Sequence, residues 1–211
     1  MEFHNYTTHQ SDWISFLLMA VVLVYGVLFF TESFQYKSTV GLLFSKDGSG
    51  KEIGFFSSVL LTLNTLVVFG LFVYLAFAYF QLALIPGPLF FLRIVFGVLV
   101  LIGIQRIVIY LHSWVTNTVD FFKKTLSLQN QFAHLAAISS LPLLILSLYS
   151  TQLNKQLIIA GATVFGGIYF IGIVKSIVSS NRIKGSLKFH LIFYLCGNEI
   201  LPFFLFYKVL I

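Results

Sequence analysis

The chain has 211 residues, of which 58% are hydrophobic and 9% charged, and its mean hydropathy is +0.95. A water-soluble fold would have too little polar surface to cover such a composition, so the sequence excludes a soluble globular protein. The formal net charge of +6 does not predict a nucleic-acid surface, because the basic residues are concentrated in particular loops between apolar runs.

These apolar runs are continuous rather than alternating, which predicts helices and not the strands of a membrane barrel. Each crossing of the hydrocarbon needs about 20 apolar residues, and about six such runs consume nearly the whole chain. The predicted architecture is an all-α, polytopic transmembrane helical bundle that forms a single integral membrane domain over residues 1–211. No stretch is left over for a separate soluble catalytic domain.

The first predicted span covers residues 13–30 and begins with Trp13, a residue type typical of the membrane interface. Residues 1–12 contain no Lys or Arg, and no small-residue cleavage site follows Phe30. This run is therefore predicted to be a retained helix and not a cleaved signal peptide. The polar stretch that follows, up to residue 52, is predicted to lie along the membrane as a short surface helix.

Two long apolar runs are predicted to span the membrane over residues 53–80 and 88–112. The Pro86-Gly87-Pro88 element between them cannot continue a helix and is predicted to reverse the chain. The next segment, residues 114–131, places apolar side chains on one helical stripe that excludes two lysines. The stripe consists of Val115, Val119, Phe122 and Leu126, and the lysines are Lys123 and Lys124. This spacing predicts a second amphipathic helix at the interface.

Three more spans are predicted over residues 132–149, 157–178 and 189–207. Small residues, which let a neighbouring backbone approach closely, are concentrated in the second of these spans. They are Gly161, Ala162, Gly166, Gly167 and Gly172. The sequence therefore predicts that this helix packs closely against other helices.

The basic residues outside the predicted spans are distributed unequally over the two sides of the membrane. If six helices alternate, eight of these residues follow the first, third and fifth spans, and two lie on the other side. The eight are Lys37, Lys46, Lys51, Lys123, Lys124, Arg182, Lys184 and Lys188, and the two are Lys155 and Lys208. The positive-inside rule then predicts that loops 31–52, 113–131 and 179–188 are cytoplasmic and that both termini lie on the outer face.

Glu199 is the only acidic residue placed well inside a predicted span, about eleven residues from the cytoplasmic end of its helix and so near mid-membrane at ~1.5 Å per residue. A lone carboxylate at that depth is costly, so Glu199 is predicted to be protonated or paired. Arg93 enters from the outer side to a similar depth, which makes Arg93 and Glu199 the preferred ion pair. The pair has two interpretations, a structural latch or a proton or ion relay.

Five further polar residues inside predicted spans are candidates for function. They are Asn64, Asn198, Arg106, His134 and His190. Membrane helices use Asn and His for interhelical hydrogen bonds worth ~0.6 kcal/mol on average, and that structural role is the alternative to a functional one at each position. Arg106 follows Arg93 by thirteen residues, which at ~100° per residue places it on another face of the helix. It is expected to snorkel to the cytoplasmic surface or to contact another helix.

The chain lacks the familiar patterns for catalysis or metal binding. Its histidines show neither HxxxH nor HExxH spacing, and it contains no P-loop, no Gly-x-Ser-x-Gly element and no paired carboxylates of a hydrolase. The single cysteine, Cys196, cannot form an intramolecular disulfide and is expected to pack as a small apolar side chain. The sequence therefore predicts no enzyme, no metal site and no bound cofactor.

The C-terminal segment carries a Leu-Cys-x-x-Glu-Ile-x-Pro pattern, formed by Leu195, Cys196, Glu199, Ile200 and Pro202. With this pattern the chain resembles an uncharacterised family of small multi-pass inner-membrane proteins of Bacteroidota, a domain of unknown function. The Gly197-Asn198 pair is more polar than the residues expected there, and the rest of the chain matches mainly in hydropathy and length. The resemblance implies a bacterium with two membranes, an inner-membrane location and a periplasmic outer face, and it implies no activity.

Two classes of function remain open. The first is a non-enzymatic inner-membrane subunit or assembly factor of a larger cell-envelope complex, because the loops are short and the small-residue helix faces invite other membrane proteins. The second is a small transporter or channel for protons, ions or a small solute, with a polar path at Asn64, Arg93 and Glu199. In both, the expected surroundings are lipid and protein, and no nucleic acid is expected.

Overall fold

A computed structural model describes the chain over residues 6–31, 55–79, 87–115, 119–150 and 154–179. The described residues form helices and no strand. The helices are α1 (Tyr6–Thr31), α3 (Phe55–Tyr79), α4 (Pro88–Val115), α5 (Val119–Tyr149) and α6 (Asn154–Ser179). All 5 are long and apolar enough to cross a membrane, so the all-helical, membrane-compatible fold predicted from the sequence is confirmed for this part of the chain.

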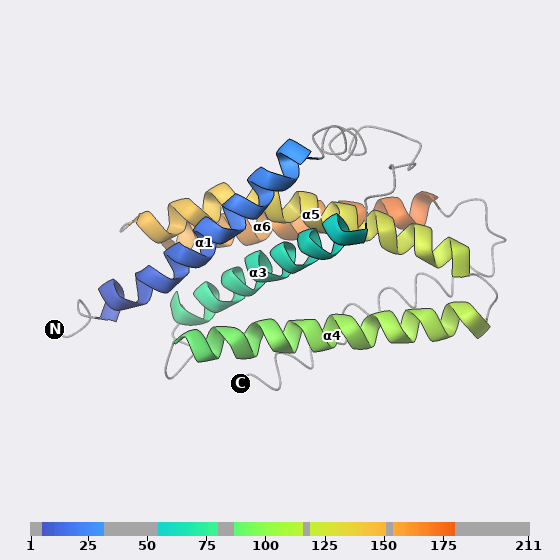
Figure 1. Cartoon of the computed structure of the whole chain (residues 1–211), viewed down its shortest axis with the longest axis horizontal. Helices are drawn as coiled ribbons and strands as arrows, with labels where there is room; N and C mark the ends of the chain where they lie inside the picture. Colours follow the sequence, from blue (N-terminus) through green and yellow to red (C-terminus); the bar gives the residue numbers. More distant parts are fainter. Residues whose placement is uncertain (1–5, 32–54, 80–86, 116–118, 151–153, 180–211) are drawn as a thin grey trace.

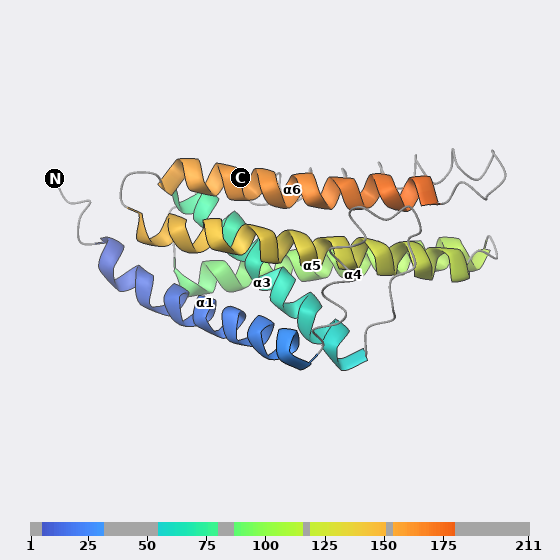
Figure 2. The ribbon, with the colours of Figure 1, turned by 90° about the horizontal axis from the view of Figure 1, so that it is seen from above.

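Helix α3 is the central helix of the bundle. It contacts α1, α4, α5 and α6, and it runs obliquely to α4, α5 and α6 (Figure 1, Figure 2). Its Val68 and Leu71 have no exposed surface, and they share one apolar core with Ile94 of α4 and Leu144 of α5. The other helices turn larger shares of their apolar side chains outward, as expected where lipid or another membrane protein covers them.

Helices α5 and α6 run side by side over much of their length, and glycines allow their close approach (Figure 2). A Cβ atom on Gly172 of α6 would overlap the Cβ of Phe132 on α5. A Cβ atom on Gly161 would lie 2.6 Å from the ring of Phe72 on α3. No residue larger than glycine therefore fits at this position either. These two glycines set the distance between α6 and the rest of the bundle.

An aromatic cluster joins the start of α1 to the end of α3 and the start of α4. The ring of Trp13 lies 5.4 Å from those of both Tyr74 and Phe91, and Tyr74 and Phe91 meet edge to face at 6.1 Å. Such aromatic pairs contribute about 0.5–1.5 kcal/mol each beyond their buried area. The cluster fixes these helix ends against one another at one end of the bundle.

The separate interfacial helix predicted over residues 114–131 is wrong, because residues from Val119 onward are the first part of a continuous helix of 31 residues, α5. No Gly or Pro interrupts the chain between Val119 and Phe132, and Leu128 and Phe132 are buried in the bundle. At ~1.5 Å per residue α5 is about 46 Å long, so its first turns extend beyond a hydrocarbon layer of ~30 Å. Its apolar span begins at Thr125.

The remaining helix boundaries lie close to those expected, although α1 begins at Tyr6, before the predicted start of its span. The predicted surface helix up to residue 52 and the predicted sixth span over residues 189–207 lie outside the described residues.

Candidate functional site

Polar side chains from three helices gather at one level inside the bundle, which we call the polar layer. Its members are Asn64 and Thr65 of α3, Arg106 of α4, and Asn130 and His134 of α5. Thr65 and His134 each lie nine residues beyond the start of their apolar spans, at Phe56 and Thr125 respectively. At ~1.5 Å per residue this is about 14 Å deep, close to the middle of a ~30 Å hydrocarbon layer.

Hydrogen bonds in the polar layer connect four helices. The side chains of Thr65 and His134 share a hydrogen bond of 2.8 Å between Oγ1 and Nδ1, which joins α3 to α5. Asn64 donates from Nδ2 to the backbone carbonyl of Val21 at 3.0 Å, which joins α3 to α1. Arg106 donates from a guanidinium nitrogen to Oδ1 of Asn130, which joins α4 to α5. The layer satisfies polar groups that would be costly to leave unpaired in hydrocarbon.

The structure places three of the residues predicted as functional in this layer. Asn64 and His134 are 6% and 5% exposed, and Arg106 is half-buried and contacts another helix instead of lipid alone. The predicted candidates Glu199, Asn198 and His190 lie outside the described residues.

Arg93 is apart from the polar layer. It is exposed on α4 and, within the described part of the chain, has neither a hydrogen bond nor an ion pair. It lies five residues after Pro88, or about 7.5 Å along the helix, so it is nearer the opposite end of the bundle. The structure therefore does not bring Asn64 and Arg93 together into one polar path.

Sequence reasoning missed two members of the layer, Thr65 and Asn130. Hydroxyl residues are common in membrane helices, so Thr65 carries little signal by itself. Asn130 falls in the segment interpreted by its apolar stripe as an interfacial helix. Its signal was its spacing from His134, since Asn130 and His134 are four residues apart and share one face of α5.

The polar layer offers hydrogen-bonding groups, one guanidinium and one hydroxyl–imidazole pair, Thr65 with His134, but no carboxylate among the described residues. The described residues also contain no group of three metal-binding side chains. Near the layer, the side-chain oxygen of Gln131 on α5 is buried without a described partner. The side chains of the polar layer can bind water or small polar species, and their hydrogen bonds hold the helices together.

Removing the hydroxyl of Thr65 should weaken the bundle. Thr65→Val leaves the buried Nδ1 of His134 without its partner, so we expect the free energy of unfolding to fall by about 0.6 and at most ~1.7 kcal/mol. The matched control is Thr163→Val on α6, because Thr163 is exposed and bonds only to the carbonyl of Ile159 in its own helix. Equal effects of the two changes on unfolding in detergent would contradict the interhelical role of Thr65.

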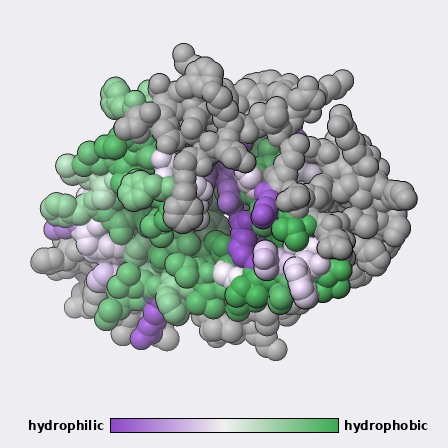
Figure 3. Space-filling view, turned by 45° about the vertical axis from the view of Figure 1, so that its right-hand side comes forward, coloured by the Kyte–Doolittle hydropathy of each residue, from purple (hydrophilic) through white to green (hydrophobic). Residues whose placement is uncertain are grey.

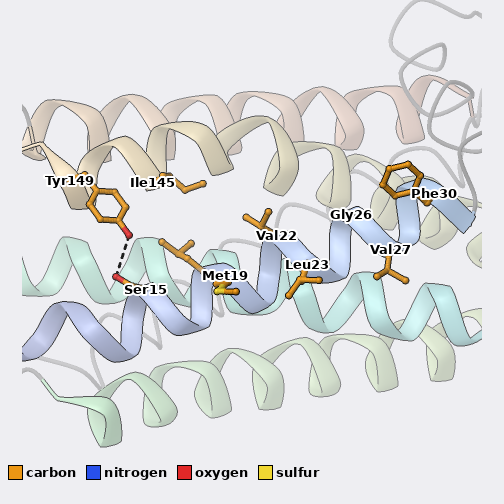
Figure 4. Close-up of a pocket in the computed structure, with 10 residues that line it drawn as sticks. Ser15, Met19, Val22, Leu23, Gly26, Val27, Phe30, Ile145 and Tyr149 are labelled. Carbon is orange, nitrogen blue, oxygen red and sulfur yellow. Dashed lines mark hydrogen bonds between the residues drawn. The ribbon is translucent and has the colours of Figure 1, made fainter.

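A groove of about 680 Å³ runs along α1 where it faces α5 (Figure 4). Its lining is almost entirely apolar and includes Met19, Val22, Val27 and Phe30. At one end the hydroxyl of Tyr149 donates to Oγ of Ser15 over 3.4 Å. The groove brings no reactive groups together.

A protein-family model described as "Domain of unknown function (DUF4271)" matches residues 5–210. No curated protein and no solved structure matches the chain. The match covers all of the helices described above, and it brings no activity, ligand or partner with it.

Proposed function

The chain belongs to this family of unknown function, and we propose that it is a non-enzymatic integral membrane subunit or assembly factor of a larger cell-envelope complex. A bacterial inner membrane is the proposed location, with both termini in the periplasm. A Bacteroidota source and the C-terminal signature at Glu199 and Pro202 belong to the same proposal.

The observation that supports this function is the division of small residues over two faces of α6. Gly161 and Gly172 are buried, and they pack against Phe72 and Phe132 respectively. Ala162, Gly166 and Gly167 are exposed, and no described atom lies within 4 Å of a Cβ built on either of these glycines. Ala162 and Gly166 are four residues apart, the spacing at which membrane helices approach each other most closely. We call this exposed surface the outer face of α6.

Purification from native membranes in a mild detergent tests the proposal. We expect the tagged chain to be recovered with other membrane or envelope proteins at fixed stoichiometry. Gly166→Leu should remove those partners without lowering the yield of the chain itself, because Gly166 packs against no described atom. Recovery of the chain as a lone monomer from its native membrane would contradict the proposal.

The orientation proposed from the loop charges gives a labelling pattern. In a background in which Cys196 is replaced by Ser, cysteines at Thr8 and Thr151 should react with impermeant thiol reagents from the periplasm, and cysteines at Ser49 and Ser186 should not. The reverse pattern would overturn the orientation. A mixed pattern would contradict the six-span count.

The mid-membrane polar layer favours a second candidate function, a small transporter or channel. Asn64 and Arg106 lie in this layer. The polar path predicted from the sequence also required Arg93, which lies outside the layer. Purified protein in liposomes should then pass protons or a small ion, and Asn64→Leu should reduce that flux. If protein that retains its native fold shows no flux, the transporter or channel function is excluded and only the subunit function remains.

A further inference from the structure

The apolar groove along α1 extends over most of the span of that helix. Its α1 residues recur at helical spacing from Ser15 to Phe30, and Ile145 and Tyr149 of α5 lie across from them (Figure 4). At ~1.5 Å per residue this stripe is about 22 Å long. Helix α1 packs mainly on α3 and departs from α5 toward Phe30, which leaves the groove open between α1 and α5 (Figure 2).

A groove of this kind is filled by hydrocarbon. Its lining is too apolar to hold water, which needs two or more polar partners, and an empty groove would forfeit the dispersion contacts of its walls. The exterior of the bundle is suited to hydrocarbon as well, since hydrophobic side chains cover much of the coloured surface in Figure 3. The occupant is therefore a lipid chain or an apolar helix.

The dimensions of the groove favour the lipid chain. Its volume is about 680 Å³. Over the same length a helix of ~10 Å diameter would occupy about 1,700 Å³, whereas a polymethylene chain with van der Waals neighbours at ~4 Å occupies about 400 Å³. Closely packed membrane helices also present small residues four positions apart. The small residues of this lining, Ser15 and Gly26, are eleven positions apart.

Polar groups occur at one end of the groove only. The apolar span of α1 begins at Asp12, three residues before Ser15, and that of α5 ends at Tyr149. This end therefore lies at the edge of the hydrocarbon layer, where the ester groups of phospholipids lie. The hydroxyl of Tyr149 donates to Oγ of Ser15 over 3.4 Å, which is long beside the usual ~2.7–2.8 Å. Because Tyr149 is 69% exposed, its hydroxyl can instead donate to an ester carbonyl.

We infer that the groove binds one acyl chain of a bilayer phospholipid, with an ester carbonyl of that lipid at the hydroxyl of Tyr149. The chain passes Met19 and Gly26 toward Phe30. The described lining contains no charged residue, so it complements a neutral ester and not the carboxylate of a free fatty acid. The inference is independent of the proposed function, because the groove lies on α1 and the outer face lies on α6.

The first test fills the groove with a side chain. No described atom lies within 4 Å of a Cβ atom built on Gly26, so Gly26→Leu occupies the groove without displacing a neighbour. The matched control is Gly103→Leu on α4, because Gly103 is equally half-buried, equally open and outside the groove. Each protein is reconstituted in vesicles of phosphatidylethanolamine and phosphatidylglycerol and washed in mild detergent, and native mass spectrometry counts the phospholipid that remains.

We expect one phospholipid to remain on the unmodified chain and on Gly103→Leu, and an occupancy at least ~5-fold lower on Gly26→Leu. Tyr149→Phe should lower the occupancy by about 2- to 10-fold, the value of one hydrogen bond. Equal occupancy of Gly26→Leu and Gly103→Leu, or a retained fatty acid in place of a phospholipid, would overturn the inference.

The second test requires no variant that could unfold. One equivalent of a phospholipid with a diazirine in its acyl chain is added to the unmodified, delipidated protein in detergent and photolysed. We expect the adducts to lie on α1 around Met19 and not around Phe96 of α4, although these two side chains are 64% and 68% exposed. Equal labelling of the two helices would show that the lipid covers the bundle without preference, and would contradict a site in the groove.

Discussion

Gly172→Leu should cost the bundle about 3 kcal/mol of stability or more, the largest effect expected of any single change considered. The side chain would have to occupy space already filled by Phe132, which is 1% exposed on α5. Because Phe132 is also packed on its other sides, α6 must move away from α5 to accommodate the change. We expect a strongly lowered Tm of the detergent-purified protein, or little folded protein at all.

The control for this prediction lies one and a half helical turns earlier, at Gly167. Gly167→Leu adds the same side chain to the outer face of α6, where it meets no described atom, so the Tm of the isolated chain should stay within a few degrees of the original. Similar losses of Tm for both variants would show that the small residues act through helix propensity and not through their neighbours.

Glu199→Gln should destabilise the protein, and adding Arg93→Gln should restore part of the loss. Arg93 is exposed on a helix long and apolar enough to span a membrane and has no described partner, and a guanidinium has no neutral form available there. If Glu199 pairs with it as a latch, removing the carboxylate alone leaves the cation uncompensated, at a cost of up to about 3 kcal/mol. Double-mutant cycles on unfolding in detergent measure this coupling.

Arg106 is the matched control for the pair. It lies thirteen residues from Arg93, or about 20 Å along α4, so Glu199→Gln and Arg106→Gln should have additive effects. If Glu199 is a relay, Glu199→Gln should instead abolish function while the fold persists and Arg93→Gln rescues nothing. Additive effects of the Glu199 and Arg93 changes on stability would exclude the latch.

The spans of the described helices could be predicted from the sequence because length and hydropathy alone decide whether a helix can cross a membrane. The continuity of α5 could not. Residues 119–131 and 132–149 are both helical in period, and whether the first part lies on the surface or continues the span depends on its contacts with α6. Those contacts, such as the packing of Leu128 in one cluster with Ile168 of α6, appear only when the helices are assembled.

The candidate site was predictable in the same partial way. Asn64, Arg106 and His134 stood out because amide, guanidinium and imidazole groups are unusual within apolar runs. Their partners, the carbonyl of Val21, Asn130 and Thr65, depend on which helices are neighbours and at what depth. Hydropathy does not fix the order of helices around α3, so these hydrogen-bond partners could not be predicted from the sequence.

The central claim is that the outer face of α6 binds another membrane protein. Photo-crosslinking in native membranes tests it most directly, with p-benzoylphenylalanine at Phe170, which is 62% exposed one turn from Gly166. The control position is Phe96 of α4, which is 68% exposed. We expect a discrete adduct with one other polypeptide from position 170 and none from position 96. Adducts with lipid alone at position 170 would contradict the account.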